Sequence, residues 1–174
     1  MQELTDVRYE EQDALAWITI DRPERLNSFT AHTVEELIEC FKHAWANRSV
    51  GVIALTGTGE RAFCVGGDQR QRRSSGDYGP SRSGLFEIEE LHRLIREVPK
   101  PVIAAVNGFA VGVGCILTVC CDLVVASERA QWRMPQARLG IAWPLDLVHT
   151  AGDLFAHIGD ESLNTLLPDV RHVG

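Results

Sequence analysis

The chain has 174 residues, of which 45% are hydrophobic and 24% charged, and its formal net charge at pH 7 is −7. This composition is typical of one globular domain, and the acidic balance argues against a broad basic surface for nucleic acid. No apolar run approaches the ~18 residues of a membrane span, and no signal peptide is visible. We therefore expect a soluble protein that binds neither nucleic acid nor a membrane.

Five cysteines occur in the chain, and none belongs to a CxxC pair. An odd number without a regular framework is typical of reduced thiols. The neighbours Cys120 and Cys121 have a poor spacing for zinc ligands. We therefore expect five packing residues, no metal site and a cytoplasmic location.

The N-terminal part of the chain predicts two strands and a helix. Residues 5–21 read as two short strands, because apolar residues alternate along the second. A helix is expected over residues 30–46. Its N-cap would be Thr30, or Thr33 paired with Glu36 in a capping box. The expected buried stripe consists of Val34, Leu37, Ile38, Phe41 and Trp45.

The remainder of the chain alternates between strands and helices. The expected elements are a buried strand over 51–56, an exposed polar loop over 70–84, a helix over 85–97, a buried strand over 101–106, a helix that starts within 112–114, and a third buried strand over 123–125. His92 falls on the polar side of its helix and is expected to be solvated. Such alternation predicts an α/β fold of βαβ units with right-handed crossovers.

One short segment resembles a cofactor motif but lies in the wrong context. Residues 57–62 (GTGERA) follow a strand and match the dinucleotide fingerprint G-x-G-x-x-A. That fingerprint opens a helix, whereas residues 63–67 are apolar and then broken by glycines. We therefore do not predict a dinucleotide cofactor.

Two glycine-rich stretches carry most of the functional signal. They are residues 61–69 (RAFCVGGDQ) and 107–115 (NGFAVGVGC), and each lies beside a short apolar strand. Glycine allows a backbone to approach a ligand closely and leaves N–H groups pointing outward. Two such loops that face each other can hold an oxygen atom that becomes negative during a reaction.

Several segments resemble the crotonase (enoyl-CoA hydratase/isomerase) superfamily in the same order. They are residues 21–27 (DRPERLN), 62–68 (AFCVGGD), 100–108 (KPVIAAVNG), 112–115 (GVGC), 121–123 (CDL) and 134–141 (MPQARLGI). The resemblance implies a crotonase-like spiral of ββα units, here short at its C-terminal end. It also implies an acyl-CoA thioester substrate, no other cofactor, and a homotrimer or hexamer.

By this resemblance, the backbone N–H groups of Gly67 and Val113 form an oxyanion hole. Losing one such donor typically costs ~3 kcal/mol of transition-state stabilisation. Val113 departs from the family pattern, because a β-branched residue restricts the backbone at that position. Tyr78, expected on an exposed loop, is a candidate donor to a substrate carbonyl.

The resemblance also implies residues that contact the coenzyme A part of the substrate. Arginine pairs with phosphate in a bidentate manner, so Arg25 and the cluster around Arg70 are candidates, although the cluster could equally be a solvated loop. Asp68 is expected to cap and orient its turn. The full candidate set is Arg25, Ala62, Cys64, Val65, Gly66, Asp68, Gln69, Arg70 and Gly112.

The acid–base residues of the family's hydratases have no counterpart in this chain. Two glutamates of those hydratases would fall at Ile116 and Gln136. Isoleucine cannot transfer a proton, and an amide has no useful pKa near neutrality. The sequence therefore disfavours simple hydration of an enoyl-CoA.

Other segments resemble the branch that contains 2-ketocyclohexanecarboxyl-CoA hydrolase and naphthoyl-CoA synthase. They are residues 66–69 (GGDQ), 76–79 (GDYG), 89–92 (EELH) and 95–100 (IREVPK). That branch opens or closes a ring through Claisen-type chemistry and an enolate. Its Ser and Asp after the glycine matching Gly140 are missing, since residues 141–143 are IAW and the nearest carboxylate is Asp146.

We divide the chain into a crotonase-like core over residues 1–143 and a divergent tail over 144–174. The apolar residues of the tail could fold back as helices and cover part of the core. The leading interpretation is an acyl-CoA ring hydrolase or C–C lyase/synthase. The alternatives are an enoyl-CoA hydratase/isomerase, and a catalytically silent protein that binds acyl-CoA or another protein.

Overall fold

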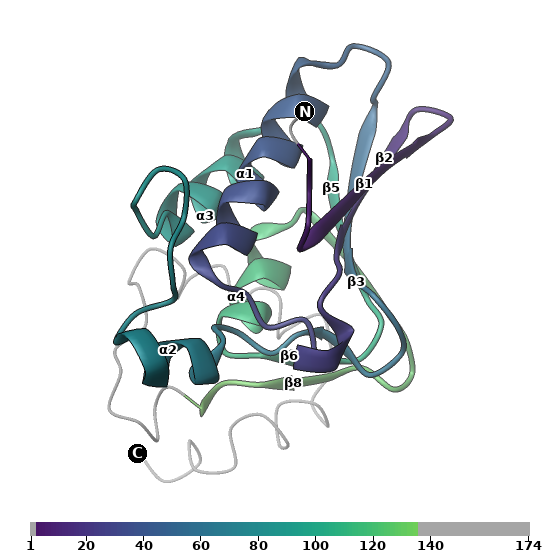
Figure 1. The fold of residues 1–174 in the computed structure, drawn as a ribbon. Helices are drawn as coiled ribbons and strands as arrows, with labels where there is room; N and C mark the ends of the chain where they lie inside the picture. Colours follow the sequence, from purple (N-terminus) through teal and green to yellow (C-terminus); the bar gives the residue numbers. More distant parts are fainter. Residues whose placement is uncertain (1–2, 136–174) are drawn as a thin grey trace, which may run out of the picture.

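The computed structural model describes residues 3–135, which form two sheets and a layer of helices (Figure 1). The larger sheet has the order β1-β2-β3-β5-β7, and the smaller has the order β4-β6-β8. The strands are β1 (Val7–Gln12), β2 (Leu15–Ile20), β3 (Val52–Gly57), β4 (Ala62–Cys64), β5 (Val102–Val106), β6 (Phe109–Val111), β7 (Leu123–Ala126) and β8 (Gln131–Arg133). Expectations for Gln136, for residues 140–146 and for the tail lie outside the described residues.

Among the strands of residues 3–135, β1 and β2 pair in antiparallel orientation and the other ladders are parallel. The helices are η1 (Pro23–Arg25, a 3-10 turn), α1 (Ala31–Ala46), α2 (Gln69–Ser75), α3 (Ile88–Glu97) and α4 (Val113–Cys120). Figure 1 shows α1, α3 and α4 on one side of the larger sheet. This arrangement confirms the predicted α/β fold.

The core lies between the larger sheet and these helices. Ile18 of β2 and its register partner Leu55 of β3 are fully buried, as are Leu37 and Phe41 of α1. Burying a side chain of this size contributes about 1.5–3 kcal/mol. The inward face of the larger sheet therefore anchors α1, α3 and α4.

Of the two caps predicted for α1, Thr30 is confirmed and Thr33 with Glu36 is wrong. Thr30 is the N-cap, and its partner in the capping box is Thr33. Glu36 is therefore not part of the box. Its buried carboxylate accepts hydrogen bonds from the N–H groups of Asp6 (2.8 Å) and Val7 (3.0 Å), so it holds the start of β1 against α1.

The predicted loop over residues 70–84 was wrong in its first half, which forms α2. The helix begins after Asp68, whose carboxylate accepts the N–H groups of Arg70 and Gln71. α2 has no buried residue, so apolar periodicity gave no sign of it. Its signal lay in the capping aspartate alone.

Three further expectations for the helices need correction. α3 begins at Ile88, so Leu85 and Phe86 precede it and are exposed. His92 is buried rather than solvated, because α3 contacts both α1 and α4. Trp45 is 42% exposed, since it lies in the last turn of α1, beyond the buried stripe.

The strand β7 was expected to be buried, but Leu123 and Val125 are 59% and 63% exposed. Within residues 3–135, β7 pairs only with β5, so it forms an edge of the larger sheet. Its apolar sequence therefore does not indicate a central position.

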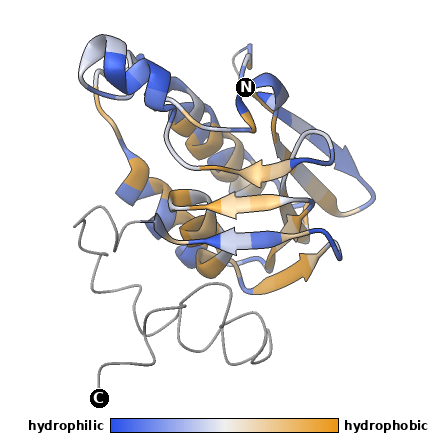
Figure 2. Cartoon of the chain, turned by 90° about the horizontal axis from the view of Figure 1, so that it is seen from below, coloured by the Kyte–Doolittle hydropathy of each residue, from blue (hydrophilic) through white to orange (hydrophobic). Residues whose placement is uncertain are grey.

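The smaller sheet was not predicted as a unit, because each of its strands has three residues. Figure 2 shows these strands side by side, with hydrophobic residues in β4 and β6 and polar residues at both ends of β8. Such strands are too short to show a period of two. They carry the two glycine loops.

Candidate active site

The two glycine-rich loops lie against each other because the strands that lead into them are paired. β4 and β6 are parallel neighbours, so the loops that follow these two strands leave the sheet at the same end. Gly66 has a φ of +87°, and a Cβ added to it would lie 3.2 Å from the carbonyl oxygen of Val111 and 3.6 Å from the nitrogen of Val113. The two loops therefore lie in contact at Gly66.

The second loop leads directly into α4. Gly112 is the N-cap, with a φ of 59°, and Val113 is the first residue of the helix. A Cβ on Gly114 would lie 1.9 Å from the carbonyl oxygen of Cys64. Only glycine therefore allows the first turn of α4 to approach the backbone of β4 this closely.

The backbone around Gly67 is held like a strand by one partner. The N–H of Phe29 donates to the carbonyl of Gly66 (2.9 Å), and the N–H of Asp68 donates to the carbonyl of Phe29 (2.8 Å). In this parallel bridge the N–H of Gly67 points away from Phe29. Within residues 3–135, neither Gly67 nor Val113 donates its N–H to a backbone acceptor.

Tyr78 covers the first glycine loop. A Cβ on Gly67 would lie 2.0 Å from the Cε1 atom of Tyr78, so the ring lies directly against the glycine. The ring also packs against Phe86 and Phe29, with centroid distances of 4.6 and 6.0 Å. The guanidinium carbon of Arg72 lies 5.7 Å from the ring centroid. The tyrosine expected on an exposed loop is therefore part of an aromatic cluster beside Gly67.

The carboxylate of Asp68 is fully engaged by the protein. It accepts the N–H groups of Arg70 (3.0 Å) and Gln71 (3.2 Å), and its second oxygen pairs with Arg22 (3.2 Å). Burial opposes ionisation, but the hydrogen bonds from Gln71 and Arg70 and the charge of Arg22 outweigh it and lower the pKa of Asp68. Asp68 therefore orients the turn as an anion and is not placed to carry a proton.

Two residues of the early turn support the site and were not singled out from the sequence. Asn27 is buried and has a φ of 54°. Its amide donates to the carbonyl oxygens of Ala62 (2.7 Å) and Thr58 (3.0 Å), so it fixes the start of β4. Arg22 joins this turn to Asp68 and, at 3.4 Å, to Asp6. Because asparagine tolerates the left-handed conformation, an asparagine in this turn was the sequence signal that could have identified Asn27.

The remaining candidate binding residues differ in their accessibility. Gln69 and Arg70 are exposed on α2, and Arg25 at the end of η1 is half-buried. The others would meet a ligand mainly through their backbone, because their side chains are absent, buried or half-buried. They are Ala62, Cys64, Val65, Gly66 and Gly112.

The first turn of α4 offers no side chain for proton transfer near neutrality. Ile116, where the sequence resemblance places one hydratase glutamate, is buried. Burial raises the pKa values of the Cys115 and Cys64 thiols to about 12. The wall of the site next to Val113 is therefore apolar and does not titrate near pH 7.

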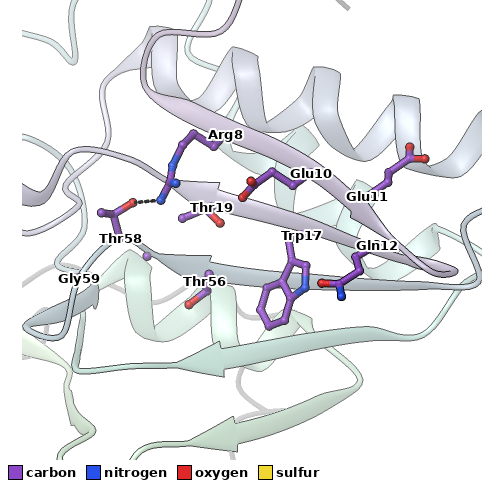
Figure 3. A pocket seen from close by; sticks show the side chains of 10 residues that line it. Arg8, Glu10, Glu11, Gln12, Trp17, Thr19, Thr56, Thr58 and Gly59 are labelled. Carbon is purple, nitrogen blue, oxygen red and sulfur yellow. Dashed lines mark hydrogen bonds between the residues drawn. The ribbon is translucent and has the colours of Figure 1, made fainter.

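A separate pocket of about 620 Å³ lies on the outer face of the larger sheet and is lined by residues of β1, β2 and β3 (Figure 3). Arg8 donates to the hydroxyl of Thr58 (2.8 Å) and pairs with Asp21 (3.0 Å), so this cation is already satisfied. Neither Gly67 nor Val113 lines the pocket.

In the described part of the chain, no helix is long and apolar enough to cross a membrane.

Comparison with known proteins supports the family resemblance found in the sequence of these loops. A family model described as enoyl-CoA hydratase/isomerase matches residues 10–153. The chain belongs to the enoyl-CoA hydratase/isomerase family. This match includes both glycine loops, the early turn with Asn27, and the segment that carries Tyr78.

Solved structures of this family share the fold. An enoyl-CoA hydratase subunit I from Geobacillus kaustophilus is 29% identical, with a TM-score of 0.74 over 94% of this chain and 61% of the other. An enoyl-CoA hydratase from Bacillus anthracis is 28% identical, with a TM-score of 0.70 over 79% of this chain and 53% of the other. One from Mycobacterium avium subsp. paratuberculosis is 28% identical, with a TM-score of 0.69 over 80% of this chain and 54% of the other. This chain thus spans between half and two thirds of their length.

Proposed function

We propose that the chain binds an acyl-CoA thioester and stabilises its enolate with the backbone N–H groups of Gly67 and Val113. The observation that carries this proposal is the contact between the two loops, each of which presents an N–H that no backbone acceptor of residues 3–135 uses. The N–H of Val113 also lies at the positive end of α4. Both donors suit an oxygen atom that gains negative charge.

The donors are held before any substrate arrives. Gly67 is fixed by the bridge to Phe29, and Val113 is fixed because Gly114 packs on Cys64. Fixed donors need no reorganisation when charge develops, and each is worth about 3 kcal/mol. An enolate is stabilised more than the neutral thioester, which is what acceleration of the reaction requires.

For the reaction itself we favour ring opening or other C–C chemistry on a cyclic β-keto acyl-CoA. Water would add to the ring ketone, the bond to the α-carbon would break, and its electrons would pass into the thioester enolate, which then takes up a proton. The place of Tyr78 beside Gly67 supports this proposal, because its hydroxyl group could donate to a substrate carbonyl. The branch resemblance in residues 66–69 and 76–79 supports it as well.

An enoyl-CoA hydratase/isomerase is the second candidate, and the family match and the hydratase structures favour it. The apolar Ile116 weighs against hydration. A catalytically silent acyl-CoA- or protein-binding protein is the third candidate. We also propose a homo-oligomer, a trimer or hexamer, which the family resemblance and the exposed Leu123 and Val125 support.

Calorimetry with free CoA and turnover of crotonyl-CoA and of 2-oxocyclohexanecarboxyl-CoA test these alternatives. We expect CoA to bind, crotonyl-CoA hydration to stay near background, and the cyclic ester to be opened. Robust hydration would replace our reaction with the second candidate, and binding without turnover would favour the third. Absence of CoA binding at millimolar ligand would remove the acyl-CoA proposal.

The variant Gly67→Pro tests the oxyanion hole, because proline has no N–H. Turnover should fall by about 10²–10³, the typical effect of losing one oxyanion donor. Circular dichroism should show that the variant is folded before its kinetics are interpreted. A folded variant with unchanged kcat would remove Gly67 from the mechanism.

A further inference from the structure

The segment 76–87 connects α2 to α3 (Figure 1). It carries two rings of the aromatic cluster, Tyr78 and Phe86. Tyr78 lies against Gly67, and Phe86 packs on both Tyr78 and Phe29, with the Phe86 and Phe29 centroids 6.1 Å apart. These rings form a wall beside the proposed oxyanion hole. The position of that wall depends on what holds the segment.

One end of the segment is attached to the start of α1. The N–H of Ala31 donates to the carbonyl oxygen of Tyr78 at 2.8 Å. Ala31 is the first residue of α1, so its N–H has no acceptor inside the helix. This bond fixes the backbone of Tyr78 but leaves the following residues to be held by other contacts.

The second attachment is the carboxylate of Glu35, one turn further along α1. Its Oε2 atom accepts the backbone N–H (2.9 Å) and the Nε–H (3.0 Å) of Arg82, and its Oε1 atom accepts the N–H of Ser83 (2.9 Å). Burial opposes ionisation, but these hydrogen bonds outweigh it and lower the pKa of Glu35. The carboxylate of Glu39 also accepts a hydrogen bond from Nη2 of Arg82 at 3.0 Å.

We propose that Glu35 is a positioning residue, which holds Arg82 and Ser83 on α1 and thereby keeps the Tyr78 ring against Gly67. This inference rests on the proposed function, because it assigns to Tyr78 and Phe86 the wall that the acyl group meets. Glu35 would not touch the substrate. It would act by keeping that wall closed, so that the protein favours CoA esters over free CoA.

Hydrogen exchange on the whole chain tests the attachment without any ligand. In Glu35→Gln the amide keeps one acceptor, but its NH₂ group faces an N–H donor. The peptide over 76–87 should then exchange about tenfold faster, as the loss of a charge-assisted bond predicts. The matched control Glu90→Gln removes a carboxylate that pairs with Arg93 on the surface of α3, and it should leave this segment unchanged.

Arg82→Gln changes an exposed side chain, so this variant should remain folded even if Glu35→Gln unfolds. It keeps the backbone N–H bond to Glu35 and loses the side-chain bonds, so it should accelerate exchange less than Glu35→Gln. Unchanged exchange of 76–87 in both variants would show that Glu35 does not hold the segment. Faster exchange throughout the chain would point to general loss of stability and would also reject the specific role.

Calorimetry with free CoA and 2-oxocyclohexanecarboxyl-CoA then tests the consequence for the ligand. Glu35→Gln should leave free CoA affinity within about twofold and lower the preference for the ester about tenfold, as Tyr78→Ala should. An unchanged preference would overturn the positioning role. If the wild-type protein binds neither compound, the proposed function fails, while the exchange measurement still decides whether Glu35 holds the segment.

Discussion

The two glycine loops present similar N–H groups but are held in different ways. The first loop depends on partners outside it, namely the backbone of Phe29, Arg22 through its ion pair with the loop's Asp68, and the ring of Tyr78. The second depends on close backbone packing, because Gly114 lies on Cys64 at the start of α4. Substitutions should therefore disturb the second loop by steric clash and the first loop by loss of its hydrogen-bond, ion-pair and ring partners.

The largest effect on stability is expected for Gly114→Ala. Its Cβ would lie 1.9 Å from a backbone oxygen, so α4 or β4 must move rather than a side chain. We expect a loss of about 3 kcal/mol in the free energy of unfolding, at the upper end of typical overpacking costs. Urea denaturation measures it. Gly51→Ala is the matched control, since its Cβ would meet atoms no closer than 3.7 Å; equal stability of both variants would contradict the packing argument.

A smaller loss of about 2 kcal/mol is expected for Asn27→Ala, which acts on the first loop through β4. The carbonyl of Ala62 loses a buried donor, and an unsatisfied buried group typically costs 1–3 kcal/mol. Alanine is also less suited than asparagine to a φ of 54°. Asn47→Ala at the half-buried C-cap of α1 serves as the control, because its amide donates to the exposed Glu11 rather than to a buried carbonyl and its loss should cost less. If both asparagine variants lost the same stability, the support of β4 by Asn27 would be refuted.

The difference between the loops also explains what the sequence could reveal. The strands predicted over 51–56 and 101–106 were readable because each contains an apolar run, at 52–55 and 102–106. The start of α4 was readable because Gly112 and Gly114 mark it. Both loops were therefore found. By contrast, the contact of Tyr78 with Gly67 depends on how a connection folds back over a loop, and no local periodicity encodes that.

Side-chain partners that come from distant segments were equally hidden. Glu36 looked like part of a capping box because the spacing from Thr33 is correct, yet it bonds the start of β1. Glu35 and Arg82 lie 47 residues apart, and nothing in either neighbourhood links them. Local rules find caps and strands, whereas the groups that hold a site in place are set by the tertiary fold.

A further substitution separates two roles of Gly67, namely the N–H that it presents and the room that it leaves for the Tyr78 ring. Gly67→Ala keeps the donor but puts a methyl group where the ring lies, so Tyr78 must move. We expect about a tenfold fall in affinity for 2-oxocyclohexanecarboxyl-CoA, or ~1.4 kcal/mol. In the Tyr78→Ala background the same change should cost little, because the methyl group no longer meets a ring. Calorimetry on the four proteins gives the coupling energy, and additive effects would show that the contact is unimportant.

The smallest effect is expected from Asp68, and it should depend on pH. Asp68→Asn keeps an N-cap acceptor and loses only the charge next to Arg22 and the N-terminus of α2, which typically costs about 0.3–1 kcal/mol. Because the folded state lowers the pKa of Asp68, its contribution is present above the ordinary carboxyl pKa and is lost as the pH falls through the lower, folded value. Urea unfolding of wild type and Asp68→Asn from pH 7 down to pH 3 should therefore show a stability difference that shrinks with acid. A difference that stays constant, or grows, across this range would mean that the Asp68 charge does not stabilise the turn after Gly67.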